Sequence, residues 1–136
     1  MNCSAGSLGA DVVCTPWISE LQKSLLLNPE VLRINQDVTP QGRPLKDGDL
    51  TLWARTLTPP TDDAPPQLAI ALYNEGDKPI SIGVSLADLV PLWGAASKVH
   101  VRDLWMRKDV GDFEGAIPPA EVAPHEAKLL GVVKVA

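Results

Sequence analysis

Prolines and glycines constrain this 136-residue chain more than any other feature. It holds 13 prolines and 10 glycines, and most of them follow residue 38. Both residue types interrupt regular structure, so a segment that contains them at this density does not support long helices. We therefore expect short strands and turns after residue 38, whereas the chain before that point can form helices.

Alternation of apolar and polar residues predicts where the strands lie. The alternating segments are 50–57, 67–74, 80–86, 98–105 and 128–135, with shorter extended pieces at 113–117 and 121–124. The turn-rich residues 75–79 predict a hairpin between 67–74 and 80–86. Residues 87–95 are expected to be a loop and residues 108–112 a turn. Six or more short strands at this spacing favour an antiparallel sandwich or barrel.

The first 37 residues are expected to form a strand followed by one or two helices. Residues 8–13 are mainly apolar and predict a short buried strand. Thr15 and Pro16 suit the N-cap and the first position of a helix, and Pro29 begins a second helix that ends near Asn35. The chain thus divides into a helical leader, residues 1–37, and a β body, residues 38–136.

Composition and motif content exclude several functional classes. The net charge of −5 and the lack of a basic patch argue against nucleic-acid binding, and no apolar run approaches the ~18 residues of a membrane span. No metal-ligand spacing and no phosphate or dinucleotide fingerprint is present, so no metal or cofactor is expected. Cys3 and Cys14 either pair in a disulfide or remain free, half-buried thiols.

The sequence alone does not identify catalytic residues. Glycoside hydrolysis requires two carboxylates about 5–10 Å apart, and three pairs of aspartates come close together in sequence: Asp47/Asp49, Asp62/Asp63 and Asp109/Asp112. All three lie in predicted turns, where aspartate is favoured for local hydrogen bonding. We interpret them as turn residues and assign no catalytic role.

Four of the six aromatic residues are tryptophans, which can act as core anchors or as platforms for sugar rings. Trp17 is expected to dock the first helix, Trp53 to lie in the core and Trp105 to pack over the edge of the sheet. Trp93 lies in a predicted loop between a proline and a glycine. It is either a plug over the core or a site where a sugar ring stacks.

Three consecutive polar residues, Asn35, Gln36 and Asp37, follow the apolar turn of the second predicted helix. In one interpretation their side chains satisfy the free carbonyls at the helix C-terminus. In the other they form a fixed joint between the helix and the β body.

Segments spread over nearly the whole chain resemble the α-galactosidase and α-N-acetylgalactosaminidase family of glycoside hydrolases, in the family's order. The first, residues 27–37, resembles the segment that ends the catalytic barrel in that family. The other similar segments are 41–43, 52–55, 68–76, 84–89, 101–105, 122–125 and 129–130. Glu126 stands where the family usually has glycine.

The resemblance implies a mainly β fold, an antiparallel Greek-key β-sandwich preceded by a short N-terminal strand and one or two helices. Residues 1–37 would be the remnant of the last βα unit of a barrel, and residues 38–136 the C-terminal sandwich. The family's catalytic aspartates, a nucleophile and an acid/base, lie on earlier barrel strands, and Asp11 matches a different aspartate near the mouth of the pocket. The chain is therefore expected to be inactive alone, and α-galactosides to be bound only through a parent catalytic domain.

Two other functions remain open at this stage. One is a free-standing carbohydrate-binding sandwich that uses Trp93 or Trp105. The other is a self-associating module, since exposed apolar residues of the leader would favour a homodimer through residues 1–36. The family suggests a secreted, lysosomal or vacuolar location, although the chain shows no targeting segment of its own.

Overall fold

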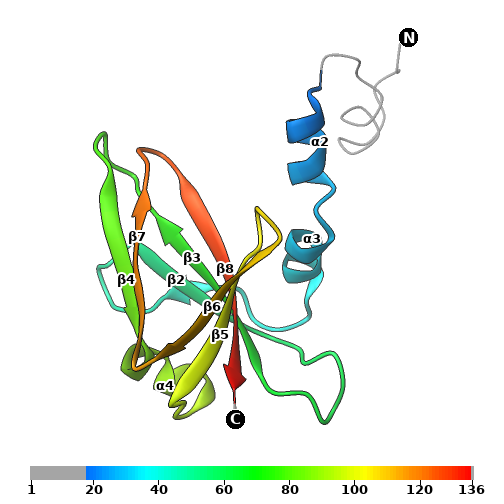
Figure 1. Cartoon of the computed structure of the whole chain (residues 1–136), viewed down its shortest axis with the longest axis vertical. Coiled ribbons are helices and arrows are strands. Elements are labelled where there is room, and N and C mark those ends of the chain that lie inside the picture. The colour runs from blue at the N-terminus through cyan, green and yellow to red at the C-terminus, as the bar shows by residue number, and fades with distance from the viewer. Residues whose placement is uncertain (1–17, 136) are drawn as a thin grey trace.

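The computed structural model describes residues 18–135, which form a β-sandwich with two helices on one side (Figure 1). The helices that precede the sandwich are α2 (Glu20–Leu26) and α3 (Pro29–Gln36), and α4 (Leu86–Trp93) lies within it. The strands are β1 (Arg43–Pro44), β2 (Leu52–Leu57), β3 (Gln67–Tyr73), β4 (Ile80–Ser85), β5 (Lys98–Asp103), β6 (Lys108–Glu114), β7 (Ala116–Val122) and β8 (Ala127–Val135). The predicted antiparallel sandwich is confirmed. No helix in the described region is long and apolar enough to cross a membrane.

The strands form two sheets of unequal size. The larger has the order β1-β2-β3-β8-β5-β6 and the smaller pairs β4 with β7, all antiparallel. Alternate residues of the large sheet, such as Ile70, Val101 and Val132, point inward and are fully buried. They meet Val84 and Val122 of the small sheet and Leu89 of α4 in one core cluster. The core therefore lies between the sheets, as alternating strands require.

Helices α2 and α3 lie on the opposite side of the large sheet from β4 and β7 (Figure 1). Residues on this side, which we call the outer face, alternate with the core residues. They include Gln67 of β3, Arg102 of β5 and Val133 of β8. The outer face is where the helical part of the chain meets the sandwich.

The predicted hairpin between 67–74 and 80–86 is wrong. Strand β3 pairs with β2 and β8, whereas β4 pairs with β7 in the other sheet. Both strands turn an apolar face to the same core from opposite sides, and alternation does not distinguish this arrangement from a hairpin. Buried Asn74 stabilises the crossing, because its amide donates to Lys78 O at 2.8 Å and Val122 O at 3.0 Å.

Three local predictions are also corrected. The expected loop 87–95 is mostly α4, which Ser85 caps and whose Leu86 and Leu89 enter the core. The expected turn 108–112 belongs to β6. The piece 113–117 spans the end of β6 and the start of β7, and 121–124 includes only the last two residues of β7. Helix α2 begins at Glu20 with Ser19 as its N-cap. Thr15 and Pro16, which were predicted to open a helix, lie outside the described residues. The strand expected at 8–13 lies outside the described residues.

Candidate functional site

Helix α3 is attached to the outer face by a set of polar contacts, and this seat is the candidate functional site. At its start Asn28 is only 2% exposed. The side-chain oxygen of Asn28 accepts from the backbone N–H groups of Glu30 and Val31, and its amide donates to Leu104 O at 2.7 Å. A single buried side chain therefore caps the helix and fixes it to the segment after β5.

Two charged residues of α3 reach the strands. Arg102 donates from Nε and Nη2 to the two carboxylate oxygens of Glu30, at 2.6 and 3.3 Å, and Arg107 Nε adds a contact of 3.1 Å. The hydrogen bond from Arg102 lowers the pKa of Glu30 below its usual value, with a smaller contribution from Arg107. On the other side, Arg33 donates to Gln67 Oε1 and to Thr58 O. Paired guanidinium groups of this kind fix orientation as well as position.

Arg55 of β2 holds the end of α3 and the chain that follows it. Its guanidinium donates to four backbone carbonyls, those of Ile34, Asp37, Thr39 and Pro40. Carbonyls at a helix C-terminus have no partner within the helix. Arg55 binds one of them and also three carbonyls of the segment that follows, residues 37–40. A lone arginine at an outward strand position gave no signal of this role in the sequence.

Asp37 forms the second half of the same junction. Its carboxylate accepts from the backbone N–H of Thr39 and from both the N–H and the hydroxyl of Thr58, at 2.9–3.0 Å. These hydrogen bonds, that from Thr39 first, lower the pKa of Asp37 far below its usual range. Asn35 and Gln36 are exposed, and their side chains make no hydrogen bond to any of residues 18–135. Of the three consecutive polar residues, Asp37 alone therefore links helix and strand.

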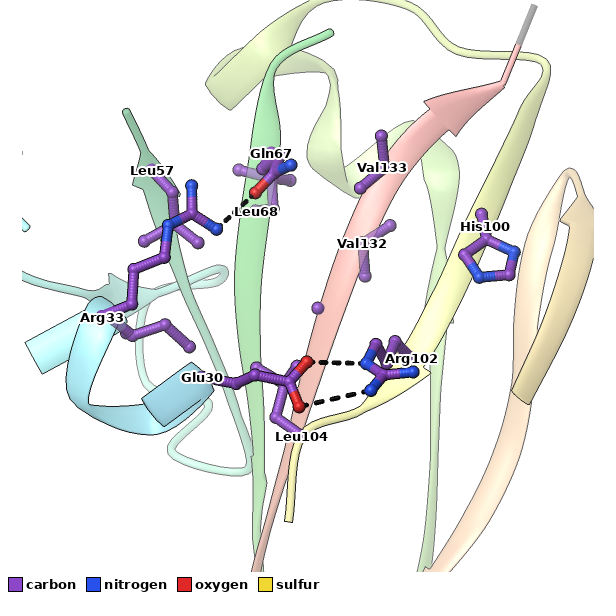
Figure 2. Close-up of a pocket in the computed structure, with 12 residues that line it drawn as sticks. Glu30, Arg33, Leu57, Gln67, Leu68, His100, Arg102, Leu104, Val132 and Val133 are labelled. Atoms are coloured by element: carbon purple, nitrogen blue, oxygen red, sulfur yellow. Dashed lines mark hydrogen bonds and ion pairs between the residues drawn. The ribbon is translucent and has the colours of Figure 1, made fainter. Parts of the chain in front are cut away.

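A hollow of about 210 Å³ lies between α3 and the sheet (Figure 2). Its floor is apolar, with Leu57, Leu104 and Val133 among its residues. Its polar rim comprises Glu30, Arg33, Gln67, His100 and Arg102. Figure 2 shows the rim groups joined in pairs, Arg33 to Gln67 and Glu30 to Arg102. The rim thus holds the helix in place with the same groups that border the hollow.

Trp53, Trp93 and Trp105 each have a structural partner in the sandwich. Trp93 ends α4 rather than lying in a loop. It packs against the core, with Lys134 Nζ 5.3 Å from its ring centroid. Trp53 is not a core residue, because its strand position faces outward between buried Leu52 and Ala54. Trp105 donates to Ala127 O at 3.1 Å.

The aspartate pairs differ in what surrounds them. Asp49 accepts from the backbone and hydroxyl of Thr51, which lowers its pKa and is typical of a turn. Asp109 and Asp112 are brought together at His100 on the outer face. No group of three metal-binding side chains suited to an ion occurs among residues 18–135. Asp11, Cys3, Cys14 and Trp17 lie outside the described residues.

Comparison with known proteins places this geometry in a family. The sequence profile described as "Alpha galactosidase C-terminal beta sandwich domain" matches residues 47–132. No curated protein shows significant sequence similarity to the chain. The match to the sequence profile covers more than half of the chain, from the segment before β2 into β8.

Solved structures share the fold over most of the chain. Alpha-galactosidase I from Mortierella vinacea is 26% identical with a TM-score of 0.70, and the match covers 88% of this chain and 30% of that one. A GH27 β-L-arabinopyranosidase from Geobacillus stearothermophilus gives 24% identity, a TM-score of 0.68, and coverage of 88% and 25%. A putative alpha-N-acetylgalactosaminidase from Bacillus halodurans is 21% identical with a TM-score of 0.68, and the match again covers 88% of this chain and 25% of that one. The chain spans less than a third of the length of each of these proteins.

Proposed function

The chain belongs to the alpha-galactosidase C-terminal beta-sandwich family, and on that premise we propose that it is the non-catalytic domain of an α-galactosidase-like hydrolase. In this proposal the sandwich holds α2 and α3 in place, and these helices form its interface with a catalytic barrel. Hydrolysis of terminal α-galactosides would then belong to the complete protein, with retention of configuration. The sandwich would contribute stability and alignment rather than chemistry.

The observation that carries this proposal is the orientation of the helices. The polar residues Glu30 and Arg33 face the sheet, whereas Leu32 is 39% exposed and Leu21, Leu26 and Leu27 of the α2 region are 49–70% exposed. Neither helix contains a buried residue. Several exposed leucines on two consecutive helices are typical of an interaction surface. Helix α3 is thus tied to the sandwich by polar groups, and the leucines of both helices remain available to another apolar surface.

A chimera with a known enzyme tests the proposal. This chain would replace the corresponding C-terminal part of alpha-galactosidase I from Mortierella vinacea. We expect the chain alone to hydrolyse no aryl α-galactoside and the chimera to be active. Leu26→Asp should lower the thermal midpoint of the chimera, because it places a charge in the proposed interface.

Val90→Ser is the matched control, since Val90 is 43% exposed on α4, and it should leave the chimera unchanged. Turnover by the purified chain alone would contradict the proposed division of labour. Equal thermal midpoints for the chimera and its Leu26→Asp variant would contradict the interface.

The exposed leucines also favour a second function, self-association of the chain through residues 1–36. A surface of this kind that lacks a covering domain tends to pair with a second copy. Light scattering of the purified chain should then report a dimer that Leu21→Ser/Leu26→Ser converts to a monomer, whereas Val90→Ser remains dimeric. If the wild-type chain remains a monomer at all concentrations, self-association is excluded.

A further inference from the structure

His100 of β5 lies between two carboxylates of the neighbouring edge strand β6. Its Nδ1 is 2.6 Å from Asp112 Oδ1, and its Nε2 is 3.0 Å from Asp109 Oδ1. The imidazole side chain is 37% exposed, so water reaches it. Both ring nitrogens are thus engaged by oxygens that, when ionised, can only accept hydrogen bonds.

A bulge in β6 creates this arrangement. Residues three apart on a regular strand point to opposite faces, yet Asp109 and Asp112 both reach His100 on the outer face. The register pairs Val101 with Gly111 but Arg102 with Asp109, so two residues of β6 advance against one of β5. Gly111 adopts φ 146°, which favours glycine at this point. The local backbone is therefore shaped to present both carboxylates to one imidazole.

Only a doubly protonated imidazole can donate to both carboxylates, because the neutral ring carries one N–H and one lone pair. We infer that the imidazolium of His100 fastens the bulged edge of β6 to β5, and that this edge loosens when the ring loses its proton. The lone pair of the neutral ring would face one carboxylate oxygen. One of the two contacts is then lost, and with it part of the link between the edge strand and the sheet.

The loosened contact is connected to the seat of α3. Asp109 Oδ1 also accepts from Arg102 Nη1 at 3.2 Å, and Arg102 binds Glu30 on the helix. Freeing Asp109 from His100 therefore changes the surroundings of a carboxylate that shares Arg102 with Glu30 of α3. This property belongs to the chain itself and does not depend on the proposed catalytic partner.

The other charged groups around His100 come from β5, from α3 and from the β5–β6 turn. On β5, Lys98 lies 3.5 Å from Asp112 and Arg102 binds Asp109. Helix α3 contributes Glu30 and Arg33 to the same hollow, and Arg107 of the β5–β6 turn reaches Glu30. Strand β8 presents the uncharged Val133 opposite His100. Among the side-chain types in this cluster, only histidine has an ordinary pKa between pH 5 and 8.

The direction of the pH effect follows from the two contacts. The hydrogen bonds to Asp109 and Asp112, in that order, raise the pKa of His100 above its usual value of 6.5. A group whose pKa is raised on folding stabilises the fold below its unfolded pKa, and the contribution is lost as pH rises through the folded pKa. The edge should therefore be tightest below the pKa of His100, while both carboxylates are ionised, and looser above it.

Amide hydrogen exchange on the whole chain, read by NMR, tests this inference. The wild type and His100→Gln are compared at equal pH, which removes the intrinsic pH dependence of exchange. Below the titration of His100, protection of the amides of residues 109–113 should be higher in the wild type by up to about fivefold, the size of an opposite-charge cross-strand pair. Above the titration of His100, the wild type and His100→Gln should show equal protection of these amides.

His125→Asn is the matched control. His125 has one ring contact, Nε2 to Asp77 at 3.2 Å, and its φ of 59° is one that asparagine tolerates. This variant should reproduce the wild-type pH dependence of the β6 edge, and β2–β3 amides provide an internal reference. A ratio of wild-type to His100→Gln protection that does not change with pH would overturn the inference, as would a neutral His100 ring at pH 6.

Discussion

The two faces of the large sheet are held by different forces. The inner face buries apolar side chains completely, with Ile70, Val101 and Val132 fully buried. The outer face binds α3 mainly through ion pairs and hydrogen bonds, and the side chains of Glu30 and Arg102 remain 27% and 33% exposed. Apolar burial stabilises without selecting a direction, whereas paired polar groups fix geometry at little net free energy. The inner face therefore supplies stability and the outer face supplies the position of the helix.

The largest effect should come from the inner face. Ile70→Ala removes fully buried methyl groups from the centre of the core and should lower the free energy of unfolding by about 2–5 kcal/mol. Urea denaturation measures this change. Leu21→Ala is the control, because Leu21 is 70% exposed, and it should change the free energy by less than about 0.5 kcal/mol. Equal losses for the two variants would contradict the description of the core.

Asn28 should give an intermediate effect, because it is the buried residue of the polar seat. Asn28→Ala removes the cap of α3 and leaves Leu104 O without its donor, at a cost of about 2 kcal/mol. Asn28→Asp retains the oxygen that caps α3 but loses the amide that donates to Leu104 O. It therefore separates the contribution of the cap from that of the hydrogen bond to Leu104. If urea denaturation of Asn28→Ala coincides with that of the wild type, Asn28 does not anchor the helix.

Asp37 should give a smaller effect that appears only in acid. Its pKa is lowered on folding by hydrogen bonds from Thr39 and Thr58. Its contribution is therefore present above its unfolded pKa, near 3.8, and is lost as pH falls through the folded pKa. Asp37→Asn should flatten the acid limb of thermal stability measured from pH 5 to 2. If the thermal stability of Asp37→Asn falls as steeply in acid as that of the wild type, other carboxylates determine the acid limb.

The inner face was largely predictable from the sequence, because alternation reports which side of a strand meets the core. Leu52, Ile70 and Val101 follow this pattern, and the strands containing them were predicted within a few residues. Alternation does not report which strands pair, so β3 and β4 were wrongly joined. It also did not show that the segment after Ser85 is a helix, where Pro91 and Gly94 favoured a loop.

The outer face was predictable only in part. The run that ends in Asp37 was recognised as a candidate joint, but its partners Arg55 and Thr58 lie 18 and 21 residues further along the chain. Glu30 and Arg102 are separated by 72 residues. Such pairs have no local sequence pattern, since a charged residue on a solvent-facing strand position is common. Their meeting depends on tertiary structure alone.

A double-mutant cycle between Glu30 and Arg102 tests the central claim, that polar pairs rather than apolar burial hold α3 on the sheet. The free energy of unfolding would be measured for the wild type, Glu30→Gln, Arg102→Gln and the double variant. The two residues should be coupled by up to about 1 kcal/mol, as expected for a paired guanidinium and carboxylate at this exposure. A coupling energy of zero would contradict the account.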